Sequence, residues 1–229
     1  MARTTRLERH VPETILTDEE YRKYLDDLMH GRRAACAAIV EGLLERRIGL
    51  TTIYLGLFQR SLYDVGAMWE RNDIPVAVEH LAAAITDSIM GVVYPTLFRS
   101  SRVDRKAVIA CVENEYHQIG ARMVADIFEL HGWDSFFLGA NTPTADIIDM
   151  IGRTDPDIVG LSLAVRSGLP PLRDAIDRIR ERFPEVRVIV GGQAFRAPGA
   201  DSLLGRRGVA YIPSVKELES LIAIETPRA

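Results

Sequence analysis

The sequence predicts an α/β protein in which a four-helix bundle is followed by a doubly wound sheet of five parallel strands. Apolar residues recur at helical spacing between about residues 17 and 98. After residue 105, short apolar runs alternate with helical patterns. A charged segment separates the two patterns. We therefore expect a flexible basic tail at 1–16, a helical bundle at 17–98, a linker at 99–105 and a sheet domain at 106–229.

The composition is typical of a globular cytoplasmic protein. Hydrophobic residues make up 47% of the 229 residues, which is enough for a sizeable core. The net charge of −4 argues against nucleic-acid binding through the body of the protein, although Arg3, Arg6 and Arg9 make its N-terminal end basic. Cys36 and Cys111 suggest neither a disulfide framework nor a thiolate metal site. No signal-peptide pattern and no uninterrupted apolar run of about 18 residues occurs, so we expect neither export nor a membrane span.

Four helices are predicted in the first half of the chain. The first begins at Thr17, a typical N-cap residue followed by three acidic residues, and ends near Met29. Gly49 follows the second helix, and residues 72–75 separate the third from the fourth. The apolar residues that define the second, third and fourth helices are Ala35, Ile39 and Leu43, then Leu55, Phe58, Leu62, Val65 and Trp69, then Val78, Leu81, Ile85, Ile89 and Val92.

Five strands are predicted in the second half of the chain. They are expected at residues 107–112, 135–138, 158–163, 186–190 and 209–212. The helical patterns between them imply parallel strands joined by right-handed crossovers, so that their carboxyl ends lie along one edge of the sheet. Ligands bind at this edge in α/β folds. The loops after the first, third and fourth strands should therefore share a cleft.

The loops of this predicted cleft carry residues suited to a metal and a bulky ligand. His117 follows the first strand, and a hydrogen bond from one ring nitrogen to Glu115 would make the other nitrogen a better metal donor. The other candidate residues are small or suited to tight turns: Gly120, Gly139, Pro143, Ser162, Ala164, Gly191 and Gly192. Each of them is also an ordinary turn or cap residue. Their joint occurrence in four loops is what makes the pattern specific.

Two other kinds of α/β domain fit the same loops less well. A dinucleotide-binding domain needs Gly-x-Gly-x-x-Gly directly after its first strand, whereas residues 115–120 read Glu-Tyr-His-Gln-Ile-Gly. An acidic side chain beside a pyrophosphate is unfavourable. A receiver-like domain needs an acidic phosphorylation cluster, which the sequence does not show.

In this order and spacing, the loop residues resemble the cobalamin-binding domain family, which implies a flavodoxin-like (Rossmann-like) fold. The resemblance implies that His117 coordinates cobalt from below, with the nucleotide base of cobalamin displaced (base-off, histidine-on). It further implies that Ser162 donates to that base, while Gly191 and Gly192 approach the nucleotide tail. Ala164 stands where the family often has a larger apolar residue or threonine. Glu115 replaces the usual aspartate and resembles the variant found in light-sensing members.

The helical half contains a second motif, in which Trp69 is followed after nine residues by Glu79 and His80. A short break lies between them, so the two helices should run antiparallel and bring these side chains to one face. The arrangement resembles the helical cap of CarH-type adenosylcobalamin photoreceptors. It implies that Trp69 covers the upper axial group and that Glu79 hydrogen-bonds the adenosyl sugar. Taken without this resemblance, Trp69 would be a core anchor, and Glu79 and His80 a solvated helix start.

One position departs from the photoreceptors that bind DNA. They have a histidine directly after the tryptophan, and it binds cobalt from above once light has removed the adenosyl group. This chain has Glu70 there. The remaining candidates for an upper ligand are His10, His30 and His80, while His131 is expected at a helix C-terminus, where the dipole favours it.

The resemblance implies a cytoplasmic, cobalamin-dependent photoreceptor without enzyme activity. Adenosylcobalamin is the favoured cofactor, and a transcription factor or repressor is the expected partner. Direct nucleic-acid binding and a membrane are not expected, and the protein could form a homo-oligomer. In these respects the protein resembles the AerR/PpaA-type antirepressors. The alternative is a corrinoid protein that carries methyl groups for a separate methyltransferase.

Overall fold

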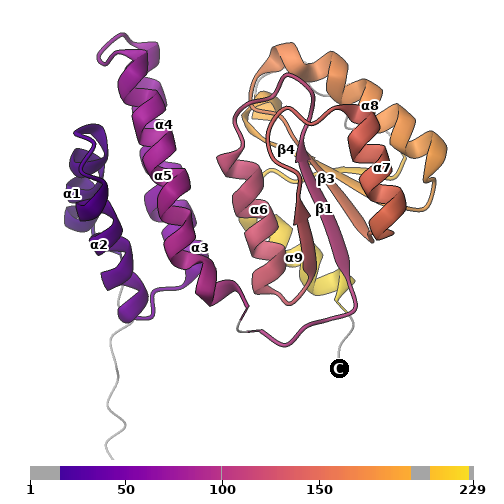
Figure 1. The fold of residues 1–229 in the computed structure, drawn as a ribbon, viewed down its shortest axis with the longest axis horizontal. Helices are drawn as coiled ribbons and strands as arrows, with labels where there is room; N and C mark the ends of the chain where they lie inside the picture. The colour runs from indigo at the N-terminus through magenta and orange to yellow at the C-terminus, as the bar shows by residue number, and fades with distance from the viewer. Residues whose placement is uncertain (1–15, 99, 197–206, 227–229) are drawn as a thin grey trace, which may run out of the picture. The chain divides into compact units, whose positions relative to one another are not determined.

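The computed structural model describes residues 16–98, 100–196 and 207–226. Its contacts divide the chain into two compact units, Met1–Val92 and Val93–Ala229, which we call the helical unit and the sheet unit and describe separately (Figure 1). The predicted tail at 1–16, with His10, lies outside the described residues except for Leu16. The predicted boundaries of the bundle and the linker remain predictions.

The helical unit contains the four predicted helices. Thr17 forms the expected N-cap, since its hydroxyl accepts from the Glu20 amide at 3.2 Å while the Glu20 carboxylate accepts from the Thr17 amide at 2.9 Å. The helical segments are α1 (Asp18–Met29), α2 (Arg33–Glu45), α3 (Leu50–Ile53), η1 (Tyr54–Gln59), α4 (Arg60–Glu70) and α5 (Val76–Leu97), whose residues from Val93 onward belong to the sheet unit.

The third predicted helix contains a π-helical segment, η1, between α3 and α4. Its aromatic residues lie in the core of the unit, where the Phe58 ring centroid is 5.8 Å from that of Tyr54 and 6.1 Å from that of Tyr24. Side-chain spacing alone does not separate a π turn from an α turn within a continuous helix, so this segment was not predicted.

The buried face of α5 differs from the predicted one. Ile85 and Ile89 are buried as expected, but Leu81 is 41% exposed. Ala82, Met90 and Val93 are buried instead. This helix is long and apolar enough to cross a membrane by length and composition, a test that core helices of globular proteins also pass.

The sheet unit contains five parallel strands, as predicted. They are β1 (Lys106–Cys111), β2 (Asp134–Phe137), β3 (Ile158–Ser162), β4 (Arg187–Gly191) and β5 (Val209–Tyr211). Their order in the sheet is β2-β1-β3-β4-β5. The direction of winding therefore reverses between β1 and β3. The loops that follow these two strands lie next to each other, and doubly wound folds bind ligands at this place.

Helices cover both faces of the sheet (Figure 1). The helical segments are α6 (Ile119–Leu130), α7 (Thr144–Thr154), η2 (Arg166–Gly168), α8 (Leu169–Arg182), η3 (Gln193–Arg196) and α9 (Val215–Glu225). On one face, α7 and α8 pack on β3 and β4 through residues such as Ile147, Leu161 and Ile176. Each fully buried side chain of this kind stabilises the fold by roughly 1.5–3 kcal/mol.

Candidate functional site

Glu115 joins two loops at the carboxyl ends of the strands. Its side chain is 1% exposed, and both carboxylate oxygens accept hydrogen bonds. One oxygen accepts from the backbone amide and from Nδ1 of His117, each at 2.7 Å. The other accepts from the backbone amides of Ala164 and Val165 at 2.6 and 3.1 Å. A single buried carboxylate therefore holds the loop after β1 against the loop after β3.

The four donors keep the Glu115 carboxylate ionised. Burial by itself raises the pKa of this group, but the hydrogen bonds from His117, Ala164 and Val165 outweigh burial and lower its pKa from 4.5 to about 2. The Glu115 side chain is consequently a fixed negative charge near neutral pH. It favours the His117 tautomer that carries its proton on Nδ1.

His117 combines a fixed orientation with an exposed ring. Its Nδ1 donates to Glu115, while 60% of the side chain is exposed. With the proton on Nδ1, the lone pair lies on Nε2, the nitrogen that could donate to a metal in this tautomer. The predicted pairing of a carboxylate with a histidine is therefore present. No cluster of three or more His, Cys, Asp or Glu side chains that could hold a metal occurs among the described residues.

The loop after β2 contacts the same carboxylate residue. The Asn141 amide donates to the Glu115 carbonyl oxygen at 2.7 Å, and its side-chain oxygen accepts from the Asn114 amide at 2.8 Å. Both asparagines have positive φ angles, 49° and 66°. Asparagine tolerates this conformation better than most residues. Gly139, with φ of 89°, precedes this turn, and Pro143 is the N-cap of α7.

The loops after β3 and β4 lie against each other at the same edge. The Leu163 amide donates to the carbonyl oxygen of Gly191 at 3.0 Å. Gly192 has φ of 114°, and a Cβ there would lie 2.2 Å from the Leu163 carbonyl oxygen. This position therefore needs glycine because of the neighbouring backbone. Ser162 and Ala164 are partly buried, and Gly120, the second residue of α6, has open space where a Cβ would be.

The helical unit places the second motif at the junction of α4 and α5. Trp69 is 45% exposed, so it is not an anchor in the core of this unit. Glu79 and His80 lie in the first turns of α5, with 3.6 Å between a Glu79 carboxylate oxygen and Nε2 of His80. The turn between the helices is closed by a hydrogen bond of 2.9 Å from the Asn72 amide to the Trp69 carbonyl oxygen.

Two further histidines occupy helix ends. His30 is the C-cap of α1, and its Nδ1 lies 2.8 Å from the Asp26 carbonyl oxygen. His131 is the C-cap of α6, with Nδ1 2.9 Å from the Ile127 carbonyl oxygen. The predicted position of His131 at a helix C-terminus is therefore confirmed.

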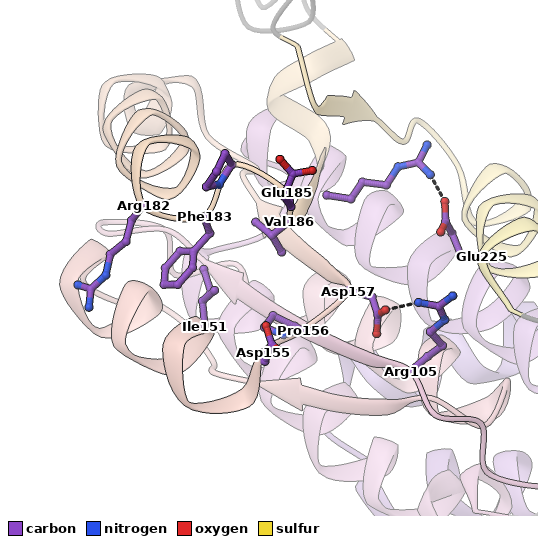
Figure 2. A pocket seen from close by; sticks show the side chains of 12 residues that line it. Arg105, Ile151, Asp155, Pro156, Asp157, Arg182, Phe183, Glu185, Val186 and Glu225 are labelled. Carbon is purple, nitrogen blue, oxygen red and sulfur yellow. Dashed lines mark hydrogen bonds and ion pairs between the residues drawn. The ribbon is translucent and has the colours of Figure 1, made fainter.

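A cleft of about 490 Å³ lies at the opposite edge of the sheet, beside the amino ends of β3 and β4 (Figure 2). Its lining includes two ion pairs, one between Arg105 and Asp157 and one between Arg187 and Glu225. None of the predicted site residues lines this cleft. The carboxyl edge with Glu115 and His117 therefore remains the candidate site.

Several contacts at this edge were not predicted. Val165 and Asn141 join the loops through main-chain atoms, and Cys111 lies beneath them. The Val165 amide donates to the Glu115 side chain, which lies 50 positions earlier. No local pattern in the sequence predicts a hydrogen bond between residues so far apart. The asparagines could have been noticed, because asparagine is enriched at positive φ.

The residues at this edge fit the corrin cofactor that the resemblance implies. A corrin ring supplies four nitrogen ligands to cobalt, so a single oriented histidine such as His117 suffices from the protein. Gly192 is exposed, so its backbone can meet a ligand on the side away from Leu163. Ser162 could supply a hydroxyl donor at the end of β3.

Comparisons with known proteins agree with this fit. A family model described as a B12 binding domain matches residues 105–219, about half of the chain, and a second model of the same description matches residues 20–94. The HTH-type transcriptional repressor CarH of Myxococcus xanthus is 30% identical over 139 residues, covering 59% of this chain and 45% of the repressor. Dimethylamine corrinoid protein 3 of Methanosarcina acetivorans is 26% identical over 144 residues, covering 61% of this chain and 67% of that protein.

A solved structure shows the same fold. The monomethylamine corrinoid protein of Methanosarcina barkeri superposes with a TM-score of 0.77 at 18% identity, covering 90% of this chain and 98% of that chain. This chain spans less than half the length of the repressor that it matches. From the family matches, the shared fold and the carboxylate-oriented histidine, we conclude that the chain belongs to the B12 binding domain family and binds a cobalamin or related corrinoid.

Proposed function

We propose that this chain is a cytoplasmic regulatory protein that responds to light through bound adenosylcobalamin and controls transcription through a protein partner. The observation that carries the proposal is the exposed Trp69 at the end of α4, followed on α5 by Glu79. A large aromatic ring that does not enter the core of its own unit is suited to cover a ligand. A carboxylate is suited to accept hydrogen bonds from the hydroxyl groups of a sugar.

In this proposal the sheet unit binds the cofactor from below. His117 would bind cobalt through Nε2 while Glu115 holds the ring in place. Ser162 would donate to the displaced nucleotide base, and Gly192 would let the backbone approach the nucleotide tail. Bound adenosylcobalamin would supply a cobalt–carbon bond that visible light breaks. Similarity to the repressor CarH supports the regulatory role, and the partner would be a transcription factor or repressor.

The alternative function is a carrier of methyl groups for a separate methyltransferase. Similarity to dimethylamine corrinoid protein 3, and a fold shared with the monomethylamine corrinoid protein over nearly its whole length, support this function. A methyl carrier has no use for a group that recognises adenosine. Trp69 and Glu79 therefore separate the two functions, because they should favour an adenosyl ligand in the first and not in the second.

Binding of adenosylcobalamin and methylcobalamin tests this difference. We expect the wild-type protein to bind adenosylcobalamin in the dark, to change its absorption spectrum under green light and to change its elution volume in size-exclusion chromatography. Glu79→Gln should weaken adenosylcobalamin binding about tenfold, because one charge-assisted hydrogen bond is lost. Methylcobalamin binding should change little. Glu41→Gln, at an exposed position of α2, is the control and should leave both affinities unchanged.

Other outcomes would favour the carrier. Equal effects of Glu79→Gln on both ligands would contradict a contact with the adenosyl group. An unchanged spectrum after illumination, together with methyl transfer when a methyl donor system is added, would replace the regulatory function by the carrier function.

Replacing His117 by alanine should change the spectrum of the bound cofactor from histidine-ligated to water-ligated or base-bound cobalt. Because the His117 ring donates one of the four hydrogen bonds to the buried Glu115 carboxylate, the protein without cofactor should also lose about 1–2 kcal/mol of stability. Absorption spectra and urea denaturation measure the two effects. His131→Ala, at the other end of α6, should leave the spectrum as in the wild type, and an unchanged spectrum in His117→Ala would contradict the assigned role.

A further inference from the structure

Cys111 lies where three loops of the candidate site meet. It is the last residue of β1 and is fully buried. Its amide donates to the Gly139 carbonyl oxygen, and its carbonyl oxygen accepts from the Thr142 amide, each at 3.0 Å. In the sheet it is the register partner of Ser162 on β3. Its backbone therefore fixes the loop after β2, and its side chain lies between the other two loops.

The Cys111 thiol interacts with both of those loops. Its Sγ lies 3.8 Å from the carbonyl oxygen of His117 and donates to it. Ser162 is the register partner of Cys111 on the adjacent parallel strand, so the two side chains lie side by side on one face of the sheet. A thiol has one weak donor and a weak acceptor, so it can donate to His117 while it accepts from the serine hydroxyl.

We infer that Cys111 is a positioning residue that fixes the backbone of His117 and the hydroxyl of Ser162 at the same time. The inference rests on the proposed roles of these two residues toward cobalamin. The lower cobalt ligand and the donor to the nucleotide base are then set by one buried side chain. A change at Cys111 should alter cobalamin binding even though the thiol itself is too deeply buried to touch the ligand.

Hydrogen bonding and simple packing can be separated by the choice of substitution. Cys111→Val keeps an apolar side chain of similar size but can neither donate to His117 nor accept from Ser162. Cys111→Ser keeps a donor and an acceptor in a smaller side chain. If the thiol acts by position, serine should preserve binding better than valine. If the thiol only fills space, valine should preserve binding better than serine.

Two corrinoids separate the contributions through His117 and Ser162. Cobinamide lacks the nucleotide tail, so it can report on His117 but not on a donor to the base. We expect Cys111→Val to weaken hydroxocobalamin binding about fivefold, a size typical of the loss of weak hydrogen bonds. Cobinamide binding should weaken by a smaller factor. Cys111→Ser should bind both corrinoids within about twofold of the wild type. Spectrophotometric titration measures the affinities, and the spectra show whether histidine remains the cobalt ligand.

Cys36 provides a matched control in the helical unit. It is also a fully buried free cysteine, and its Sγ lies 3.9 Å from a backbone carbonyl oxygen, that of Tyr24. Cys36→Val should leave the ratio of the two affinities unchanged. Wild-type binding of both corrinoids in Cys111→Val, or serine no better than valine, would overturn the inference alone. A wild-type protein that binds neither corrinoid would overturn it together with the proposed site.

Discussion

Replacing Glu115 by glutamine should destabilise the protein without cofactor by about 3 kcal/mol, which is the free energy that corresponds to a pKa lowered from 4.5 to about 2. Each oxygen of this buried carboxylate accepts two hydrogen bonds. Glutamine would turn an NH₂ group toward either His117 or the amides of Ala164 and Val165. Donors would then face donors in a buried site. Urea denaturation monitored by circular dichroism measures the loss.

Glu113→Gln is the matched control for this substitution. Glu113 lies two residues earlier in the same loop and is exposed. Its replacement should change the free energy of unfolding by less than about 0.5 kcal/mol. A loss of similar size in both variants would contradict the role of Glu115 as a link between the loops.

The Glu115 contribution should also depend on pH in a defined direction. A carboxylate whose pKa is lower in the folded state stabilises the fold above its unfolded pKa, and this stabilisation is lost as the pH falls toward the folded pKa. The difference in stability between the wild type and Glu115→Gln should therefore be constant above about pH 5 and shrink between pH 4.5 and about 2. A difference that stays constant down to pH 3 would contradict this account.

Replacing Gly192 by alanine should destabilise the sheet unit by about 3 kcal/mol or more. Its φ of 114° is unfavourable for an L side chain, and the new Cβ would lie 2.2 Å from the Leu163 carbonyl oxygen and 2.8 Å from the carbonyl carbon. The neighbouring atoms belong to the backbone at the end of β3, which cannot move without disturbing the sheet. Thermal and urea unfolding of the protein without cofactor measure the effect.

Gly120 is the control for this substitution and also tests the site. It lies in α6 with open space around a Cβ, so Gly120→Ala should leave stability unchanged or raise it by up to about 1 kcal/mol. If a corrinoid approaches the start of α6 closely, the same variant should bind cobalamin less tightly. A stable Gly192→Ala variant would show that the backbone at this edge can rearrange.

Local patterns were sufficient to predict most of the fold. The strands alternate with helices of clear periodicity, and every predicted strand overlaps an observed one. The N-cap at Thr17 was also predicted, because capping depends on residues only three apart in the chain. By contrast, the exposure of Leu81 was not predicted, because periodicity identifies an apolar face without showing which neighbour covers it.

The sequence by itself determined the order of the strands along the chain, the loops that carry His117, Ser162 and Gly192, and the family to which these residues point. These features depend on residues close together in sequence, where propensity and spacing act. The tertiary structure alone decided that Glu115 reaches the amides of Ala164 and Val165, and that Cys111 lies between His117 and Ser162. The contacts of Glu115 with Ala164 and Val165 join residues 49 and 50 positions apart. They form because packing the parallel strands side by side brings the ends of β1 and β3 together.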